Sequence, residues 1–149
     1  MERRSVIEPT VLIVETTAGE PPVEFLGETS GLVYFMSMAH SERYGADHPL
    51  AKAASIMKRR MKLAINPLLN FGDAKAETSE ERALLEKLWQ DAEPLAAAAR
   101  AVAGAIDSAD DIREPTSRFP DLPDRLRELA EIADWAAERD ARVRLTYAL

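Results

Sequence analysis

The strongest indication of the fold is the stretch of residues 84–106, which reads LLEKLWQDAEPLAAAARAVAGAI. Its apolar residues recur every three or four positions, which is typical of one face of a helix. The stripe consists of Leu84, Leu85, Leu88, Trp89, Ala92, Leu95, Ala96, Ala99, Val102, Ala103 and Ile106. Thr78 and Glu81 have the spacing of a capping box, so we expect a helix over residues 79–107. Because the stripe continues across Pro94, which lacks a backbone N–H, the pattern predicts a kink there rather than a break.

Three further segments, residues 31–44, 49–66 and 123–140, carry apolar side chains at the same helical spacing. The segment 49–66 is the most clearly amphipathic, with Pro49 at its first position and Pro67 directly after its end. Four helices joined by modest loops are expected to be antiparallel neighbours, so the sequence predicts an antiparallel four-helix bundle.

Both ends of the chain predict strands. Residues 10–16 are rich in β-branched and aliphatic side chains, and a turn containing glycine and proline separates them from a second candidate strand at residues 23–27. This pattern predicts an N-terminal hairpin. Because residues 11–14 are apolar on both faces, we expect the first strand to lie centrally in a sheet. Residues 143–149 alternate between apolar and other side chains, which predicts a C-terminal strand with one buried face.

The composition is typical of one globular domain over residues 1–149, of class α+β and mainly α, with 46% apolar and 30% charged residues. The absence of cysteine excludes disulfides, thiolate nucleophiles and zinc–thiolate sites. No apolar run approaches the roughly 20 residues that span a membrane, and Arg3 and Arg4 are not followed by the apolar segment of a signal peptide. We therefore expect a cytoplasmic protein without a membrane partner. The net charge of −7 disfavours nucleic acid as a partner.

The two histidines, His40 and His48, lie close in sequence to Glu42 and Asp47. Imidazole and carboxylate groups together suit zinc, manganese or iron, so these four residues are candidate metal ligands. Their spacing matches neither H-E-x-x-H nor the Glu-x-x-His pairing of di-iron bundles. Helix capping and surface polarity are therefore the favoured interpretation, and we expect no cofactor.

Two pairs of acidic residues suit an alternative function, in which carboxylates bind a metal ion. Glu80 and Glu81, followed much later by Glu131 and Asp134, resemble the carboxylate motifs with which all-α nucleotide pyrophosphatases bind magnesium. The resemblance implies a small metal-dependent hydrolase. The chain departs from that pattern because Leu84 stands where a third glutamate belongs, and because the two acidic segments are too far apart in sequence.

Two surfaces are candidates for partner binding. Arg59 and Arg60 belong to a basic run that suits an acidic partner. Ala97 and Ala101 lie opposite the apolar stripe on a helix with small side chains all round, which is either central in its own bundle or part of a subunit interface. A terminal strand also needs a sheet to join, in this chain or in another copy. From these features we expect a homodimer.

A small-ligand pocket between the first helix and the sheet is a further alternative. It would be lined by Phe35, Met36 and Met38, and Tyr34 and Trp135 could join it. Because no segment carries a convincing catalytic motif, we identify no catalytic residues. The favoured function is a non-catalytic interaction or regulatory domain that acts through its helix surfaces and self-associates.

Overall fold

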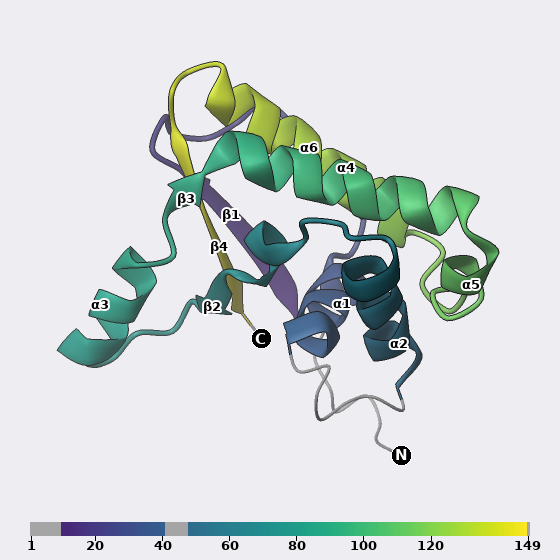
Figure 1. The fold of residues 1–149 in the computed structure, drawn as a ribbon. Helices are drawn as coiled ribbons and strands as arrows, with labels where there is room; N and C mark the ends of the chain where they lie inside the picture. The colour runs from purple at the N-terminus through teal and green to yellow at the C-terminus, as the bar shows by residue number, and fades with distance from the viewer. Residues whose placement is uncertain (1–9, 41–47, 149) are drawn as a thin grey trace, which may run out of the picture.

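The structure, a computed structural model, describes residues 10–40 and 48–148. Within these ranges the chain forms an α+β fold in which helices predominate (Figure 1). The helices are α1 (Ser30–His40), α2 (Pro49–Ser55), α3 (Ser79–Glu86), α4 (Ala92–Ser108), α5 (Asp110–Arg113) and α6 (Leu122–Ala137). The strands are β1 (Val11–Thr16), β2 (Phe71–Asp73), β3 (Gln90–Asp91) and β4 (Arg142–Ala148).

The C-terminal strand β4 is the centre of a small mixed sheet. It pairs with β1 in antiparallel register from Val11 opposite Ala148 to Thr16 opposite Val143. On its other side, β4 pairs with β2 in a parallel arrangement and with the two-residue β3 in an antiparallel arrangement. The predicted C-terminal strand is thus confirmed, and its main partner is the N-terminal strand.

The predicted N-terminal hairpin is wrong, because residues 23–27 form no strand. The prediction that the first strand lies centrally is wrong for the same reason: β1 has one partner and lies at the edge of the sheet. The apolar run in β1 was expected to be covered on both faces, but its residues differ in exposure. Val11 is 52% exposed, whereas Leu12 is buried under α1.

Helices α4 and α6 lie side by side and run in opposite directions, and they are the most closely associated pair of elements (Figure 1). Pro123 is in the first turn of α6, where its missing N–H costs no hydrogen bond. Asp140 adopts a left-handed conformation with φ of 54°, which ends the turn after the helix. The predicted helix 123–140 is therefore confirmed, with its regular part ending at Ala137.

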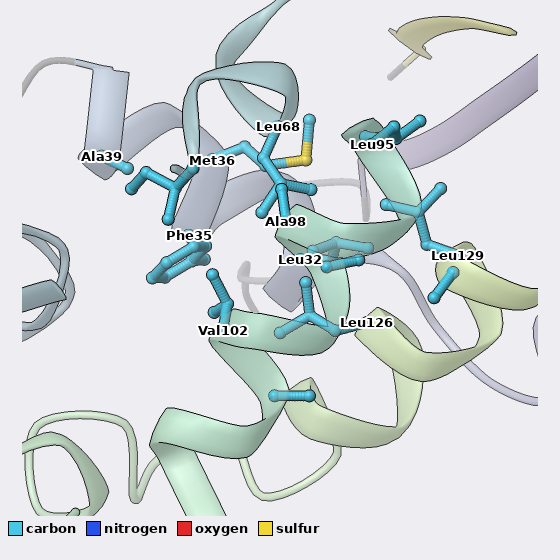
Figure 2. Packing of buried hydrophobic residues seen from close by; sticks show 14 of the residues in the cluster. Leu32, Phe35, Met36, Ala39, Leu68, Leu95, Ala98, Val102, Leu126 and Leu129 are labelled. Atoms are coloured by element: carbon cyan, nitrogen blue, oxygen red, sulfur yellow. The ribbon is translucent and has the colours of Figure 1, made fainter. Parts of the chain in front are cut away.

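The core lies between α1, α4, α6 and the 3₁₀ turn Asn66–Leu69, whose side chains point toward one another (Figure 2). Its fully buried residues include Leu32, Phe35, Met36, Leu68, Leu95, Leu126 and Leu129. Burial of each such side chain stabilises the fold by about 1.5–3 kcal/mol before the entropy of ordering is subtracted.

The predicted single kinked helix over residues 79–107 is wrong. Two helices, α3 and α4, are separated by residues 87–91, and part of this connection pairs with β4 as β3. Pro94 is the third residue of α4, so its missing N–H falls in the first turn, where no intrahelical acceptor exists. The Asn70 side chain donates to the carbonyl of Leu88 at 3.1 Å, and the Gln90 side chain donates to that of Pro67 at 3.0 Å. These bonds hold the connection in a non-helical conformation.

Helix α3 lies away from the other helices (Figure 1). It buries no side chain, and Leu84 is 61% exposed. Arg144 of β4 tethers this region, because it donates to Glu86 at 3.0 Å and its guanidinium lies 4.5 Å from the ring centre of Trp89. The described residues therefore do not confirm an antiparallel four-helix bundle.

The predicted helix 49–66 ends early. Helix α2 continues into a π-helical turn, Ile56–Arg60, and Lys62 then adopts a left-handed conformation with φ of 57°. The N–H of Leu63 donates back to the carbonyl of Met57 at 2.9 Å, which closes the helix end. The predicted end of the helix 31–44 lies outside the described residues. In the part of the chain that is described, no helix has the length and apolarity needed to cross a membrane.

Candidate functional site

A groove with a volume of about 1060 Å³ lies along the edge strand β1. We call it the edge groove. One wall is β1 with the residue before it, and the other is residues 20–29, which we call the rim segment. The lining residues are Thr10, Val11, Leu12, Val14, Glu20, Pro21, Val23, Glu24, Phe25, Gly27, Glu28, Thr29 and Ile132. The groove is partly open to solvent.

A buried ion pair of α6 holds the rim segment in place. Arg125 and Glu128 are each 8% exposed, and the Arg125 Nε lies 2.8 Å from the Glu128 Oε1, although its N–H is not aimed well enough to form a hydrogen bond. The backbone N–H of Leu26 donates to the same carboxylate at 3.4 Å. Gly27 packs so closely on Arg125 that a Cβ there would lie 2.2 Å from its Nη1. The rim segment is therefore held on α6 at Leu26 and Gly27, and its end is bonded to β1 through the Thr29 side chain.

The outer edge of β1 carries backbone groups without partners among the described residues. Leu12 donates its N–H to the Thr29 Oγ1 at 2.8 Å, so its backbone faces away from β4. Because hydrogen-bonded and non-hydrogen-bonded residues alternate along an antiparallel pair, the backbone of Val14 faces the same way. The carbonyl of Leu12 and both backbone groups of Val14 thus face the edge groove.

The side chains of the edge groove combine an apolar surface with negative charge. Val11 is half exposed, and Val23 and Phe25 are partly exposed on the opposite wall. The residues that line the groove include three exposed glutamates, Glu20, Glu24 and Glu28, and no basic side chain. The groove therefore has the chemistry of a site for a ligand that is both apolar and cationic.

The predicted metal ligands are not brought together by the part of the structure that is described. The Nδ1 of His48 accepts a hydrogen bond from the N–H of Leu50 at 3.1 Å, which caps α2 as expected. His40 is exposed at the end of α1, with its ring 6.1 Å from that of Phe71. Glu42 and Asp47 lie outside the described residues. Within residues 10–40 and 48–148, no three histidine, aspartate or glutamate side chains cluster in the way that a metal site requires.

The four carboxylates that resemble a pyrophosphatase motif lie on two separate helices. Glu80 and Glu81 are in the first turn of α3, whereas Glu131 and Asp134 are on α6. Hydrogen bonds from the backbone N–H groups of Glu77 and then Thr78 lower the pKa of Glu81, so this carboxylate serves the helix cap. Asp134 pairs with Arg100 of α4. Two of the four groups are therefore engaged within the fold.

The predicted partner-binding residues lie on separate surfaces. Arg60 forms an ion pair with Asp111 of α5, and Arg59 is exposed beside it on the π-helical turn. Ala97 is exposed and Ala101 half-buried on the outer face of α4, while the opposite face of the helix is in the core. The sequence allows α4 to be central in its own domain or part of a subunit interface. Its central position in the fold explains the buried face, while the outer row of small residues stays uncovered.

The residues of the predicted small-ligand pocket are dispersed. Phe35 and Met36 are fully buried in the core, and Met38 packs against it. Tyr34 is partly exposed, with its ring 5.1 Å from that of His48 and 5.7 Å from that of Phe119. Trp135 lies under the guanidinium of Arg139 at 4.3 Å.

No protein-family model, curated protein or solved structure matches this chain. The edge groove was not predicted from the sequence. The spacing of Glu20, Glu24 and Glu28 beside an apolar strand was the available signal. It could not be interpreted from the sequence, because the same residues fit the turn and second strand of a hairpin equally well.

Proposed function

We propose that this chain is a non-catalytic interaction domain that binds a segment of another polypeptide in the edge groove. The observation that carries the proposal is the outer edge of β1, where the backbone groups of Leu12 and Val14 face an open apolar groove. An exposed strand edge of this kind offers main-chain hydrogen bonds for affinity and neighbouring side chains for specificity. The polypeptide partner would thus bind at the sheet edge, whereas the sequence favours the helix surfaces.

A selection experiment tests this function without knowledge of the natural partner. A library of random peptides displayed on phage is selected against the full chain, and the enriched peptides are measured against two variants. Val23→Trp narrows the edge groove, and Leu84→Trp introduces the same side chain on α3, away from the residues that line the groove. We expect Val23→Trp to weaken binding by about tenfold or more, as for a residue central to an interface, and Leu84→Trp to leave binding unchanged. Failure to enrich any peptide that is sensitive to Val23→Trp would refute the proposal.

Self-association is the second part of the proposed function. The outer face of α4 presents Ala97, Ala101 and Gly104 at successive turns, and small residues allow a second helix to approach closely. Sedimentation velocity at micromolar concentration is expected to detect a dimer that Ala101→Arg dissociates and Glu80→Gln on α3 does not. A monomer across the whole concentration range would remove self-association from the proposal and leave the edge groove unaffected.

A further inference from the structure

We infer that the edge groove takes a cationic segment in extended conformation, which joins the sheet as an additional strand beside β1. This inference rests on the proposed function, because it specifies the chemistry and conformation of the polypeptide that the groove binds. It commits to a partner that carries lysine or arginine at alternate positions and apolar residues between them.

The shape of the edge groove favours a strand. The rim segment alternates between half-buried side chains (Pro21, Val23 and Phe25) and exposed ones (Pro22, Glu24 and Leu26), a pattern typical of an extended chain. Within the described ranges, no hydrogen bond between two backbone groups joins this segment to residues 10–14, and the Leu12 N–H bonds to the Thr29 side chain. The position next to β1 that the sequence assigned to a hairpin strand is thus open. Beside Val14 the rim segment lies on α6, where the Leu26 N–H donates to Glu128 and Gly27 packs on Arg125.

The backbone of β1 provides the hydrogen bonds that a strand needs. The carbonyl of Leu12 and the N–H and carbonyl of Val14 are spaced as in an antiparallel or a parallel ladder, so a strand of either direction can bond to all three. The N–H of Leu12 is already used by Thr29, which limits the pairing to the part of β1 that lines the groove. An added strand would therefore place its central residue beside Val14.

The charge of the groove selects the partner. Successive side chains of a strand point to opposite faces, so one set can contact Val11, Val23 and the surface over Ile132 while the other reaches solvent at the rim. The rim carries Glu20, Glu24 and Glu28, and lysine or arginine on the partner would lie beside them. Two copies that paired edge to edge through β1 would bring the three glutamates of each groove together, so local repulsion disfavours a second copy as the occupant.

The test uses the full chain and a hexapeptide of alternating lysine and valine with blocked ends and a fluorescent label. Fluorescence anisotropy measures the affinity, and hydrogen exchange followed by NMR measures the protection of the Val14 amide. We expect binding that weakens as salt is added, together with slower exchange at Val14. Glu24→Gln should weaken binding about two- to five-fold, as expected for one exposed ion pair, whereas Glu80→Gln on α3 should leave it unchanged. The same peptide with N-methyl groups on alternate residues should lose binding, because it cannot donate to β1.

Several results would overturn the inference. Equal binding of the N-methylated peptide, or no change in exchange at Val14, would show that the ligand does not join the sheet. Equal or tighter binding of a glutamate–valine hexapeptide would exclude selection by charge. Protection of Val14 in the protein alone that rises with protein concentration would identify a second copy as the occupant. If the library yields peptides that are sensitive to Val23→Trp while the lysine–valine peptide fails to bind, the inference is refuted and the proposed function stands.

Discussion

Two leucines from one sequence stripe are expected to respond very differently to the same substitution. Leu84 and Leu95 both belong to the helical pattern of residues 84–106, and a single kinked helix would bury them alike. In the structure Leu95 is fully buried on α4 and Leu84 is largely exposed on α3. Leu95→Ala and Leu84→Ala therefore remove the same atoms from opposite environments.

The size of each effect follows from burial. Truncating a fully buried leucine to alanine costs the lost transfer free energy and leaves a cavity, together about 2–5 kcal/mol. For a domain whose total stability is about 5–15 kcal/mol, Leu95→Ala is a large loss. A change at an exposed site such as Leu84 usually stays within about 0.5 kcal/mol. At about 2–4 °C per kcal/mol for a chain of this length, a loss of about 3 kcal/mol lowers the melting temperature by about 6–12 °C.

Urea denaturation followed by circular dichroism measures both variants. We expect Leu95→Ala to lower the midpoint strongly with an unchanged slope, and Leu84→Ala to be close to the parent protein. Losses of similar size in the two variants would refute this reasoning. Such a result would mean that Leu84 is buried, and that residues 84–106 form one continuous helix after all.

Three further outcomes follow from the structure. Arg125→Ala should lower the free energy of unfolding by about 3–5 kcal/mol because it leaves the Glu128 carboxylate buried without an opposite charge. Arg125→Met with Glu128→Leu should retain most of the stability in urea denaturation, and equal losses would contradict this. The lowered pKa of Glu81 means that its carboxylate stabilises the start of α3 above the ordinary glutamate pKa, and that this contribution is lost as the pH falls through the lower folded-state value. The protection factors of the α3 amides, which correct for the intrinsic pH dependence of exchange, should therefore fall over that acidic range in the parent and show no such fall in Glu81→Gln. Gly104→Ala should stabilise α4 by about 0.4–1 kcal/mol, because a Cβ there meets nothing within 4 Å, and a lower melting temperature would disprove it.

Much of the secondary structure was readable from local patterns. The helix 123–140 and the C-terminal strand were predicted correctly because their periods are uninterrupted and their ends carry clear signals, such as Pro123 in the first turn of α6. The capping box of Thr78 and Glu81 was also predicted and is present. These features depend on neighbours within about four residues, which the sequence displays directly.

The errors arose where distant residues compete for the same segment. The stripe of residues 84–106 is compatible with one helix, but Asn70 and Gln90 hydrogen-bond the connection before Pro94, and β4 pairs with it. The expected hairpin failed because Leu26 bonds to Glu128, which lies 102 residues later in the chain. No local pattern reports such contacts.

The candidate site was beyond sequence reasoning for the same reason. His48 caps α2, as the sequence favoured, and Arg60, a candidate for partner binding, pairs with Asp111. The edge groove is lined by valines and glutamates of a kind found in many strands and loops. They indicate a binding site only because β1 lies at the edge of the sheet, which the sequence does not show.

The amino-acid sequence by itself determined that this chain is mainly helical with strands at its two ends, because hydrophobic period and capping residues act over one or two turns. Only the tertiary structure decided that β4 is central, that β1 is an edge strand, and that the rim segment packs on α6 and forms no strand beside β1. Those outcomes depend on contacts between residues that are far apart in the sequence. The buried ion pair of α6 and the hydrogen bonds of β4 form only when the folded chain brings their partners together.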